Sequence, residues 1–262
     1  MLNNLILIKK YFNYLFNAKT RHGIHSPFVY KLIEDCIYNK NYFEEFKIIE
    51  RIRKDLIKSS EVIEITDFGA GSKINNTNKR AVSDIAKKSA KNEKYGKLLF
   101  NLCMYFQPQK GLELGTSLGI SALYQVFGSK KMTLITLEGC PNTSKIAQQI
   151  FKNAGLNNIE IRVGDFNKTF PEELSKIENL DYVFFDGNHQ EEPTINYFED
   201  CLRKVNNDTF FVFDDIHWSE GMEKAWDYVK NHSKVTISID LFMVGIVFFR
   251  KEQPKQHFVV RY

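Results

Sequence analysis

Short apolar runs alternate with amphipathic segments along the second half of the chain. Runs with the length of buried strands occur at 110–114, 132–138, 159–163, 181–186 and 209–214, and segments with a helical period occur at 117–127, 142–154, 191–204 and 219–231. This alternation predicts an α/β fold in which helices cover a mostly parallel sheet. Two β-rich runs, 235–241 and 243–249, follow with almost no linker. A parallel crossover needs a long connection, so these runs must pair as an antiparallel hairpin.

The first 95 residues have a mainly helical pattern instead. Apolar positions recur at helical spacing over 2–16, 28–36, 42–58 and 82–90. Ser26 and Pro27 predict a helix start, since serine caps the amino end of a helix and proline suits its first turn. We therefore expect an N-terminal helical extension at 1–95 and a sheet domain at 96–262.

Arg21, His22 and His25 stand just before this helix start. Two interpretations remain open for them. They contact a phosphate or carboxylate of a substrate, or they are polar surface groups of a capped turn.

The stretch Leu112–Ser121 joins the first predicted strand of the sheet domain to its helix through a turn with Gly115 and Gly119. Glycine lets the backbone approach a ligand where a β-carbon would obstruct it, and the first turn of a doubly wound sheet is a nucleotide site. Glu138 ends the next predicted strand, 25 residues after Glu113 (138 − 113). An acid at that place accepts hydrogen bonds from the two hydroxyls of a bound ribose.

The same turn separates two classes of nucleotide-binding protein. A nicotinamide-dependent dehydrogenase needs Gly-x-Gly-x-x-Gly, so that the helix amino terminus holds a pyrophosphate. Here Thr116 and Ser117 follow a single Gly115. The turn therefore favours a ribose-bearing ligand without a pyrophosphate.

These motifs resemble those of the class I S-adenosylmethionine-dependent methyltransferases, over residues 96–262. The matching segments are Glu113–Gly119 for the first motif, Leu137–Gly139 for the ribose-binding second, Val163–Phe166 for the strand end that borders adenine, and Tyr182–Asp186 and Phe210–Asp215 for the fourth and fifth strands. The resemblance implies a Rossmann-like, seven-stranded sheet and S-adenosyl-L-methionine as cofactor. The cofactor-binding residues that it implies are Glu113, Gly115, Thr116, Ser117, Gly119, Glu138, Gly139, Asp165 and Asp186.

A second glycine loop, Asp67–Ser72, follows a strand-like run at 62–65 and competes with the first motif. The residues after it are polar and rich in asparagine where a buried helix should begin, and no apolar strand that ends in an acid follows about 20 residues later. We interpret the segment as a loop, either a connector with glycines at positive φ or a cover over the mouth of the active site.

Acidic residues end the fourth and fifth predicted strands at Asp186, Asp214 and Asp215. The carboxyl ends of parallel strands open onto one crevice and Mg²⁺ accepts carboxylate ligands, so this trio predicts a divalent metal site. His189 is the candidate general base, since much of an unperturbed imidazole is neutral near pH 7. The alternatives are a cofactor contact or helix cap for Asp186, and a surface histidine for His189.

Metal-dependent O-methyltransferases of the catechol type are similar, because they carry an acid at the fourth strand end, a base three residues later and an acidic pair or Asp-Asn at the fifth. The base position here is His189 and not lysine. The sequence Asp186-Gly187-Asn188-His189 resembles the Asp-Gly-x-His of sugar and macrolide O-methyltransferases. The resemblance implies catalytic roles for Asp186 and His189, a small-molecule hydroxyl acceptor, and Mg²⁺ as a candidate second cofactor. His217 is a weaker metal or substrate candidate, and Trp218 is either a pocket wall or a core contact.

Composition limits the partners and the location. Residues 1–100 carry 19 basic and 11 acidic residues and residues 101–262 carry 17 and 21, but the basic positions have helix-surface spacing, so we expect a solvated face and no nucleic-acid partner. Four well-separated cysteines favour neither a zinc site nor a disulfide framework and indicate a cytoplasmic protein. Lys9 and Lys10 interrupt the N-terminal apolar run after too few residues for a membrane span.

Methyl transfer from S-adenosylmethionine to oxygen is the function that these patterns favour. We expect the N-terminal extension to help form the acceptor pocket or a homodimer contact. Two alternatives stay open: a nicotinamide-dependent Rossmann oxidoreductase on the same strand order, and a non-catalytic S-adenosylmethionine-binding module.

Overall fold

The computed structural model describes residues 2–66, 78–88 and 92–262. The chain forms two compact units: unit 1 consists of Met1–Tyr38 and Ile177–Tyr262, and unit 2 is Asn39–Lys176. The division of the chain at residue 95 stays a prediction. The Asp67–Ser72 loop, the rival glycine motif of the sequence, lies outside the described residues.

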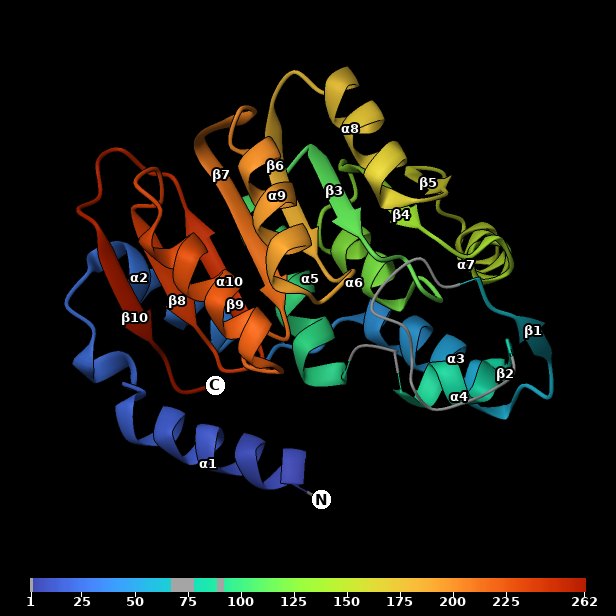
Figure 1. The fold of residues 1–262 in the computed structure, drawn as a ribbon, viewed down its shortest axis with the longest axis horizontal. Helices are drawn as coiled ribbons and strands as arrows, with labels where there is room; N and C mark the ends of the chain where they lie inside the picture. Colours follow the sequence, from blue (N-terminus) through green and yellow to red (C-terminus); the bar gives the residue numbers. More distant parts are fainter. Residues whose placement is uncertain (1, 67–77, 89–91) are drawn as a thin grey trace. The chain divides into compact units, whose positions relative to one another are not determined.

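Unit 2 contains three parallel strands with helices around them and a small hairpin (Figure 1). Its elements are α3 (Glu44–Lys58), β1 (Val62–Glu64), β2 (Lys79–Ala81), α4 (Val82–Lys88), α5 (Glu93–Phe106), β3 (Lys110–Leu114), α6 (Ile120–Gly128), β4 (Thr133–Glu138), α7 (Pro141–Asn153), β5 (Ile159–Val163) and α8 (Phe166–Lys176). Strand β4 lies between β3 and β5, with Glu113 opposite Thr136 and Glu138 opposite Val163. The ends of all three strands that carry the first motifs are therefore neighbours.

Aromatic packing holds the helices of unit 2 against one another. Phe46 of α3 contacts Phe100 of α5 with ring centroids 4.8 Å apart, and both side chains are buried. Gly96 of α5 lies against the ring of Tyr124 in α6, where a β-carbon would clash. Glycine is thus needed for the close crossing of α5 and α6, which fixes the helix that follows β3.

Unit 1 contains five strands in the order β6-β7-β9-β8-β10. Its elements are α1 (Leu2–Asn17), the 3₁₀ turn η1 (Arg21–Gly23), α2 (Pro27–Leu32), the π-helical turn η2 (Ile33–Ile37), β6 (Leu180–Phe185), α9 (Glu191–Cys201), β7 (Val205–Asp214), α10 (Glu220–Asn231), β8 (Ile237–Asp240), β9 (Val244–Phe248) and β10 (Gln256–Val259). Strands β6 and β7 are parallel, β9 is antiparallel to both β7 and β8, and β10 is parallel to β8. The antiparallel hairpin predicted at the end of the chain is confirmed.

The N-terminal and C-terminal segments of unit 1 are bound to each other. Tyr14 of α1 is buried, and its hydroxyl donates to the carbonyl of Val260 at 2.5 Å and accepts from the N–H of Tyr262 at 3.0 Å. The backbone N–H of Lys19 donates to the carbonyl of Val259 at 2.8 Å. Helix α1 therefore packs beside the C-terminal segment (Figure 1). Within the described residues, no helix is both long and apolar enough to cross a membrane.

Four elements were not predicted, the short elements η1 and β2 together with α8 and β10, and one helix begins later than expected. Helix α8 contains Pro171 and buries only a few side chains, so no clear helix could be predicted there from the sequence. Strand β10 has only four residues and pairs along one edge with β8. Helix α6 starts at Ile120 and not at Ser117, because the turn continues to Gly119 in a left-handed conformation.

Candidate functional site

The turn after β3 is held by backbone hydrogen bonds to the end of β4. The N–H groups of Gly115 and Thr116 both donate to the carbonyl of Leu137 at 3.0 Å. Gly115 has φ 101°, Ser117 has φ 48° and Gly119 has φ 80°, so the turn uses the left-handed region three times. This conformation leads the chain from the strand end into α6.

The structure requires glycine at position 119 for a reason other than the expected approach of a ligand. A β-carbon there would lie 2.6 Å from ring atoms of Phe151 in α7 and 3.3 Å from the β-carbon of Ala147. The close approach at Gly119 is thus between α6 and α7. Its glycine is required by helix packing and by its positive φ.

A chain of buried polar side chains lies within unit 2 and fixes this turn. Glu113 is 0% exposed and accepts from Nε2 of Gln125 and from Oγ1 of Thr136, both at 2.6 Å. Oγ1 of Thr136 also lies 2.7 Å from Oγ1 of Thr116, which is itself buried. Because the single hydroxyl proton of Thr136 goes to Glu113, Thr116 is the donor to Thr136. Glu113 and Thr116 therefore use their side chains to position the turn.

Glu138 links the end of β4 to the turn after β3. Its Oε2 accepts from the N–H of Ser117 and its Oε1 from the N–H of Cys140, each at 2.8 Å. The residue is half-buried, as is its neighbour Gly139. A carboxylate oxygen can accept more than one hydrogen bond, so these two backbone bonds are compatible with a further bond from a ribose hydroxyl. The predicted ribose acid therefore stands beside the predicted cofactor turn.

Asp165 stands at the next strand end. The N–H of Gly164, which has φ 146°, donates to the carbonyl of Glu138 at 2.9 Å. The Oδ1 of Asp165 accepts from the N–H of Asn167 at 2.9 Å and so caps the first turn of α8. The structure thus brings Glu138 and Asp165 to adjacent strand ends, and it gives Asp165 a capping role that the sequence analysis missed.

A contact near Glu138 had no signal in the sequence. The N–H of Thr66 donates to Sγ of Cys140 at 3.4 Å, and Nδ2 of Asn142 donates to the carbonyl of Glu64 at 2.9 Å. These bonds fasten the β1 hairpin to the amino end of α7, two residues beyond Glu138. Only the tertiary fold reveals such a contact, since more than 70 residues separate its partners.

In unit 1, the predicted acids follow two paired strands. Phe185 of β6 is opposite Phe213 of β7, so Asp186 and Asp214 continue directly from paired residues. Asp214 is 5% exposed, and Asp215 has φ 55°. Among the residues that the structure describes, no three or more His, Cys, Asp or Glu side chains are grouped as a metal site would group them.

His189 lies beside Asp186. Its Nε2 is 3.7 Å from Oδ1 of Asp186, and the two side chains are 30% and 18% exposed. This distance is longer than a hydrogen bond and suits an ion pair when the imidazole is protonated. Asn188 between them has φ 51°, and its Oδ1 is buried without a hydrogen-bond partner in the described part of the chain. The loop therefore keeps the acid and the imidazole close to each other.

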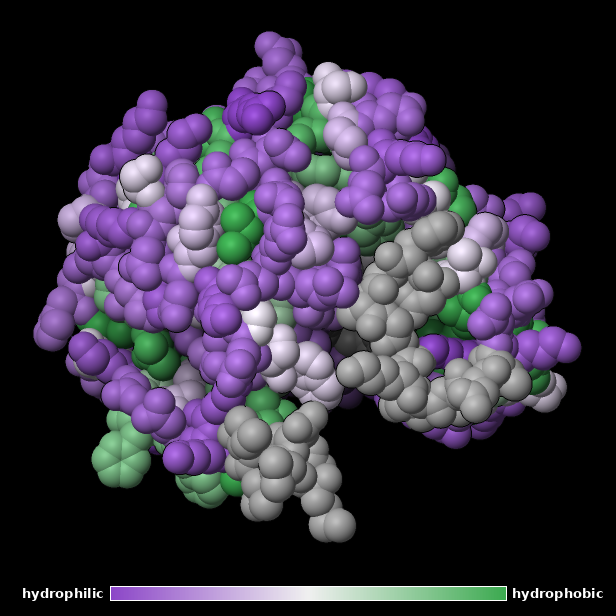
Figure 2. Space-filling view, viewed as in Figure 1, coloured by the Kyte–Doolittle hydropathy of each residue, from purple (hydrophilic) through white to green (hydrophobic). Residues whose placement is uncertain are grey.

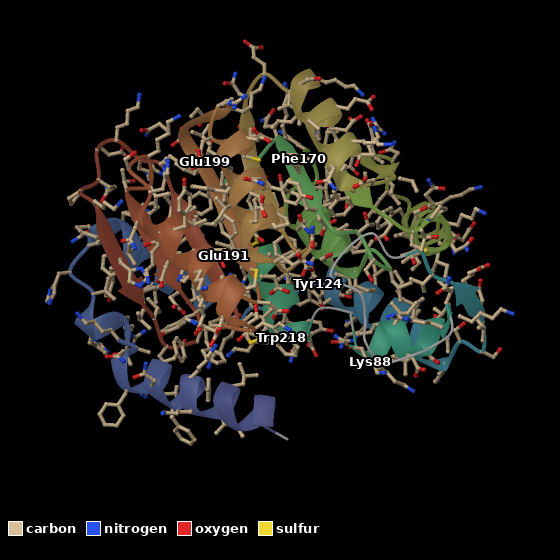
Figure 3. All side chains as sticks on the ribbon, viewed as in Figure 1. Lys88, Tyr124, Phe170, Glu191, Glu199 and Trp218 are labelled. Atoms are coloured by element: carbon tan, nitrogen blue, oxygen red, sulfur yellow. The ribbon has the colours of Figure 1, made fainter. Side chains whose placement is uncertain are left out.

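His217 and Trp218 have different surroundings. Nε2 of His217 is 2.8 Å from Oδ2 of Asp240, and its Nδ1 is 3.1 Å from Oε1 of Glu223. Burial alone would lower the pKa of His217, but hydrogen bonds and charges from these two carboxylates raise it above its ordinary value. Trp218 is 61% exposed, so the expectation of a core contact is wrong (Figure 3).

Comparisons with known proteins agree with this geometry. A family model described as a methyltransferase domain matches residues 112–216, whereas the search of curated proteins finds no match. The SAH-bound methyltransferase PaMTH1 from Podospora anserina is 13% identical, with a TM-score of 0.61 over 87% of this chain and 97% of that one. The O-methyltransferase from Bacillus cereus, in complex with SAH, is 17% identical, with a TM-score of 0.55 over 84% and 96%. The O-methyltransferase TomG from Streptomyces achromogenes, involved in tomaymycin synthesis and in complex with SAM, is 20% identical, with a TM-score of 0.52 over 62% and 82%.

At these identities the likeness shows the fold, and the predicted Rossmann-like α/β architecture is confirmed. The expected number of seven strands is corrected to eight in the described residues, because β10 adds a strand beside β8. The methyltransferase-domain match covers part of the chain, residues 112–216, and together with the fold it supports an S-adenosylmethionine-dependent methyltransferase. The resemblance of its motifs to this class is thereby confirmed, and the oxidoreductase alternative is not favoured.

Proposed function

We propose that the protein transfers the methyl group of S-adenosylmethionine to an oxygen of a small-molecule acceptor. The observation that carries the proposal is the place of Glu138, whose carboxylate bridges the end of β4 and the N–H of Ser117 in the turn after β3. Two of the similar structures, from Bacillus cereus and Streptomyces achromogenes, are named O-methyltransferases, which supports transfer to oxygen.

The cofactor contacts that we propose lie in unit 2. Glu138 accepts the two ribose hydroxyls, and Asp165 and Gly139 border the adenosine at neighbouring strand ends. Gly115 and Ser117 present the backbone of the turn to the cofactor. For Glu113, Thr116 and Gly119 the buried contacts favour positioning of this turn.

The acceptor chemistry that we propose uses the loop after β6. Bound S-adenosylmethionine would supply an electrophilic methyl group, and the bond between this carbon and the sulfonium sulfur would break to leave S-adenosylhomocysteine. His189 removes the proton of the acceptor hydroxyl as its oxygen attacks the methyl carbon, and Asp186, 3.7 Å from Nε2, stabilises the imidazolium that forms. The rate then depends on deprotonation and on an in-line approach of the acceptor, so positioning is the main task of the protein.

Trp218 supports an acceptor site near these residues in unit 1. A tryptophan that is 61% exposed is unusual for a residue type that is mostly buried, and it follows Asp215 by three positions. We propose that its indole ring forms a wall of the acceptor pocket. An exposed aromatic ring binds flat or weakly polar molecules by stacking.

Mg²⁺ is the second cofactor that we propose, held by Asp186, Asp214 and Asp215. Its support is the chemistry of the donors, because Mg²⁺ binds through one or two carboxylates with water and substrate oxygens, and β6 and β7 bring two of these acids side by side. Mg²⁺ at this place would lower the pKa of an acceptor hydroxyl. The described side chains form no group of three donors, so only experiment decides metal dependence.

Location and partners belong to the same proposal. All four cysteines are buried and outside disulfide bonds, which supports a reducing, cytoplasmic environment. We propose a small-molecule acceptor and no nucleic-acid partner. Residues 1–95 contribute to the acceptor pocket or to a homodimer contact.

Replacement of the ribose acid tests the proposal most directly. Glu138→Ala removes charge-assisted hydrogen bonds to the ribose, so the affinity for S-adenosylmethionine should fall by about 1.5–3 kcal/mol in isothermal titration. Glu160→Ala on β5 is a matched control, since that carboxylate is exposed and binds Arg162. A folded Glu138→Ala protein that binds the cofactor as tightly as wild type would show that the ribose is held elsewhere.

A further inference from the structure

Helix α1 carries the densest group of exposed apolar side chains in the described structure. Four of the eleven most exposed large apolar residues lie within nine positions on this helix. Ile8, Phe12 and Phe16 are 51%, 64% and 95% exposed, and Tyr11 is 40% exposed. Residues four apart on a helix lie one above the other, so Ile8, Phe12 and Phe16 form a single row, here called the α1 row.

The opposite face of α1 is bound to the rest of unit 1. Tyr14 is 5% exposed, Nζ of Lys10 is 2.8 Å from Oε2 of Glu223, and the ring of Tyr11 meets Phe242 with centroids 4.9 Å apart. The helix is therefore docked by one side, and the α1 row points away from unit 1. In Figure 2, separate hydrophobic side chains project among hydrophilic ones where Figure 1 draws the described part of α1.

The charged residues of the segment that carries the α1 row all have one sign. Residues 1–33 contain five basic residues and no acidic residue, and the first acid of the chain is Glu34. Lys9 is exposed next to Ile8 on the helix, and Lys19 is exposed three residues after Phe16, just beyond the end of α1. An apolar row between cations complements a surface that is apolar inside and negatively charged outside.

We propose that α1 binds the surface of a bilayer that contains anionic phospholipid, with the α1 row inserted between the headgroups. The helix lies parallel to the membrane, so Lys9 and Lys19 reach the lipid phosphates while the docked face stays on unit 1. A second copy of the chain would fit the α1 row less well than a membrane surface. If two α1 rows met across a twofold axis, the lysines of both helices would approach each other, and α1 has no acidic residue to pair with them.

Vesicle sedimentation of the full chain tests the proposal. The protein should sediment with phosphatidylcholine vesicles that contain phosphatidylglycerol, and much less with phosphatidylcholine alone. Phe12→Ser/Phe16→Ser should weaken sedimentation by about tenfold or more, because it removes two rings of the α1 row. High salt should also weaken it, since it screens the lysines.

A matched control separates the α1 row from exposed aromatic residues in general. The control variant is Tyr30→Ser/Tyr42→Ser. These two tyrosines are 42% and 53% exposed and lie outside α1, so the variant should sediment like wild type. The proposal fails if wild type ignores anionic vesicles, or if Phe12→Ser/Phe16→Ser binds them equally well. It also fails if wild type is a dimer that this variant converts to a monomer and no vesicle binding is seen, because a second copy then covers the row.

Discussion

Backbone strain occurs at the ends of three strands that carry the candidate site. Ser117 follows β3 with φ 48°, Asn188 follows β6 with φ 51°, and Asp215 follows β7 with φ 55°. Only two other non-glycine residues in the described structure have positive φ. A non-glycine residue in this region costs on the order of 1–3 kcal/mol and persists where the surrounding structure requires it, often at ligand sites. The strain supports functional roles for these turns.

The imidazole of His189 offers a test at the scale of one residue. If it takes the acceptor proton, His189→Ala should lower turnover by about 10²–10⁴-fold, the usual effect of a lost general base, and should leave S-adenosylmethionine binding nearly unchanged. Turnover is measured as labelled methyl transferred to the acceptor found by screening cell extract. His232→Ala is a suitable control, because His232 pairs with Glu199 and is not a candidate for the site.

A His189→Ala protein with wild-type turnover would assign the proton to another group. Single-turnover kinetics then separate the chemical step from product release. A variant that changes only the Michaelis constant for the acceptor would point to substrate binding by His189.

The strand-end acid Glu138 could be predicted from the sequence, whereas the roles of Glu113 and Thr116 could not. A motif shows that an acid precedes a glycine turn, but it does not show which way the side chain points. Glu113 points into the interior because Gln125 and Thr136 offer it donors there. These partners lie 12 and 23 positions away and form no pattern of their own.

Between the elements β3 and β4, Thr136 is the central contact. Thr136→Val keeps the shape of the side chain but leaves a buried oxygen of Glu113 without its donor and removes the acceptor of Thr116. The free energy of unfolding should fall by about 1–3 kcal/mol in urea titration, with weaker cofactor binding because the turn loosens. Thr133→Val at the exposed start of β4 is the control and should change the free energy of unfolding by less than about 0.5 kcal/mol. Equal effects of both variants would contradict a special role for the buried chain.

The pairing of α8 with β5 should make stability depend on pH. Burial alone would raise the pKa of Glu173, but hydrogen bonds from Lys176 and Arg162 lower it below its ordinary value. A carboxyl with a lowered folded-state pKa stabilises the protein above its unfolded pKa, and this contribution is lost as pH falls through the folded pKa.

Stability should therefore decline on acidification from about pH 5 to below pH 4, and less steeply in Glu173→Gln. Urea titrations across this range measure the difference. Glu172→Gln is the control, because Glu172 is 67% exposed and shares the same lysine. The assignment is wrong if Glu173→Gln and wild type lose stability in parallel.

The predicted elements were those with a strong local period. The apolar runs of β3 and β5 have the predicted bounds, and most others differ by a few residues at their ends. Helix α8 escaped prediction because Pro171 lies inside it, and proline ordinarily interrupts a helix. Strand β10 escaped because its pairing with β8 is a tertiary contact.

At the scale of the whole molecule, the compact units do not follow chain order. Met1–Tyr38 belongs with Ile177–Tyr262, although more than 130 residues separate them in sequence. The bonds between Tyr14 and Val260 and between Lys10 and Glu223 join positions more than 200 apart. A local pattern of apolar positions gives no information about such contacts. The sequence therefore predicts the helix α1 but not the segment against which it packs.

The proposed metal and cofactor sites fall in different units, and this makes them separable by experiment. Asp186, Asp214 and Asp215 belong to unit 1, whereas Glu138 belongs to unit 2. Exhaustive chelation of the whole protein should abolish methyl transfer, and added Mg²⁺ should restore it, because the acceptor hydroxyl would keep its proton without the ion. Titration with S-adenosylmethionine should give nearly the same affinity before and after chelation.

Substitution of one acid completes this test. Asp215→Asn should behave like the chelated protein, with cofactor affinity retained and turnover lost at any Mg²⁺ concentration near the physiological range. Asp208→Asn is the matched control, because Asp208 is an exposed residue of β7, the strand that Asp215 follows. Unchanged turnover after chelation would remove the metal from the mechanism. The three acids would then serve the loops or the cofactor, and His189 would act as the base without help from an ion.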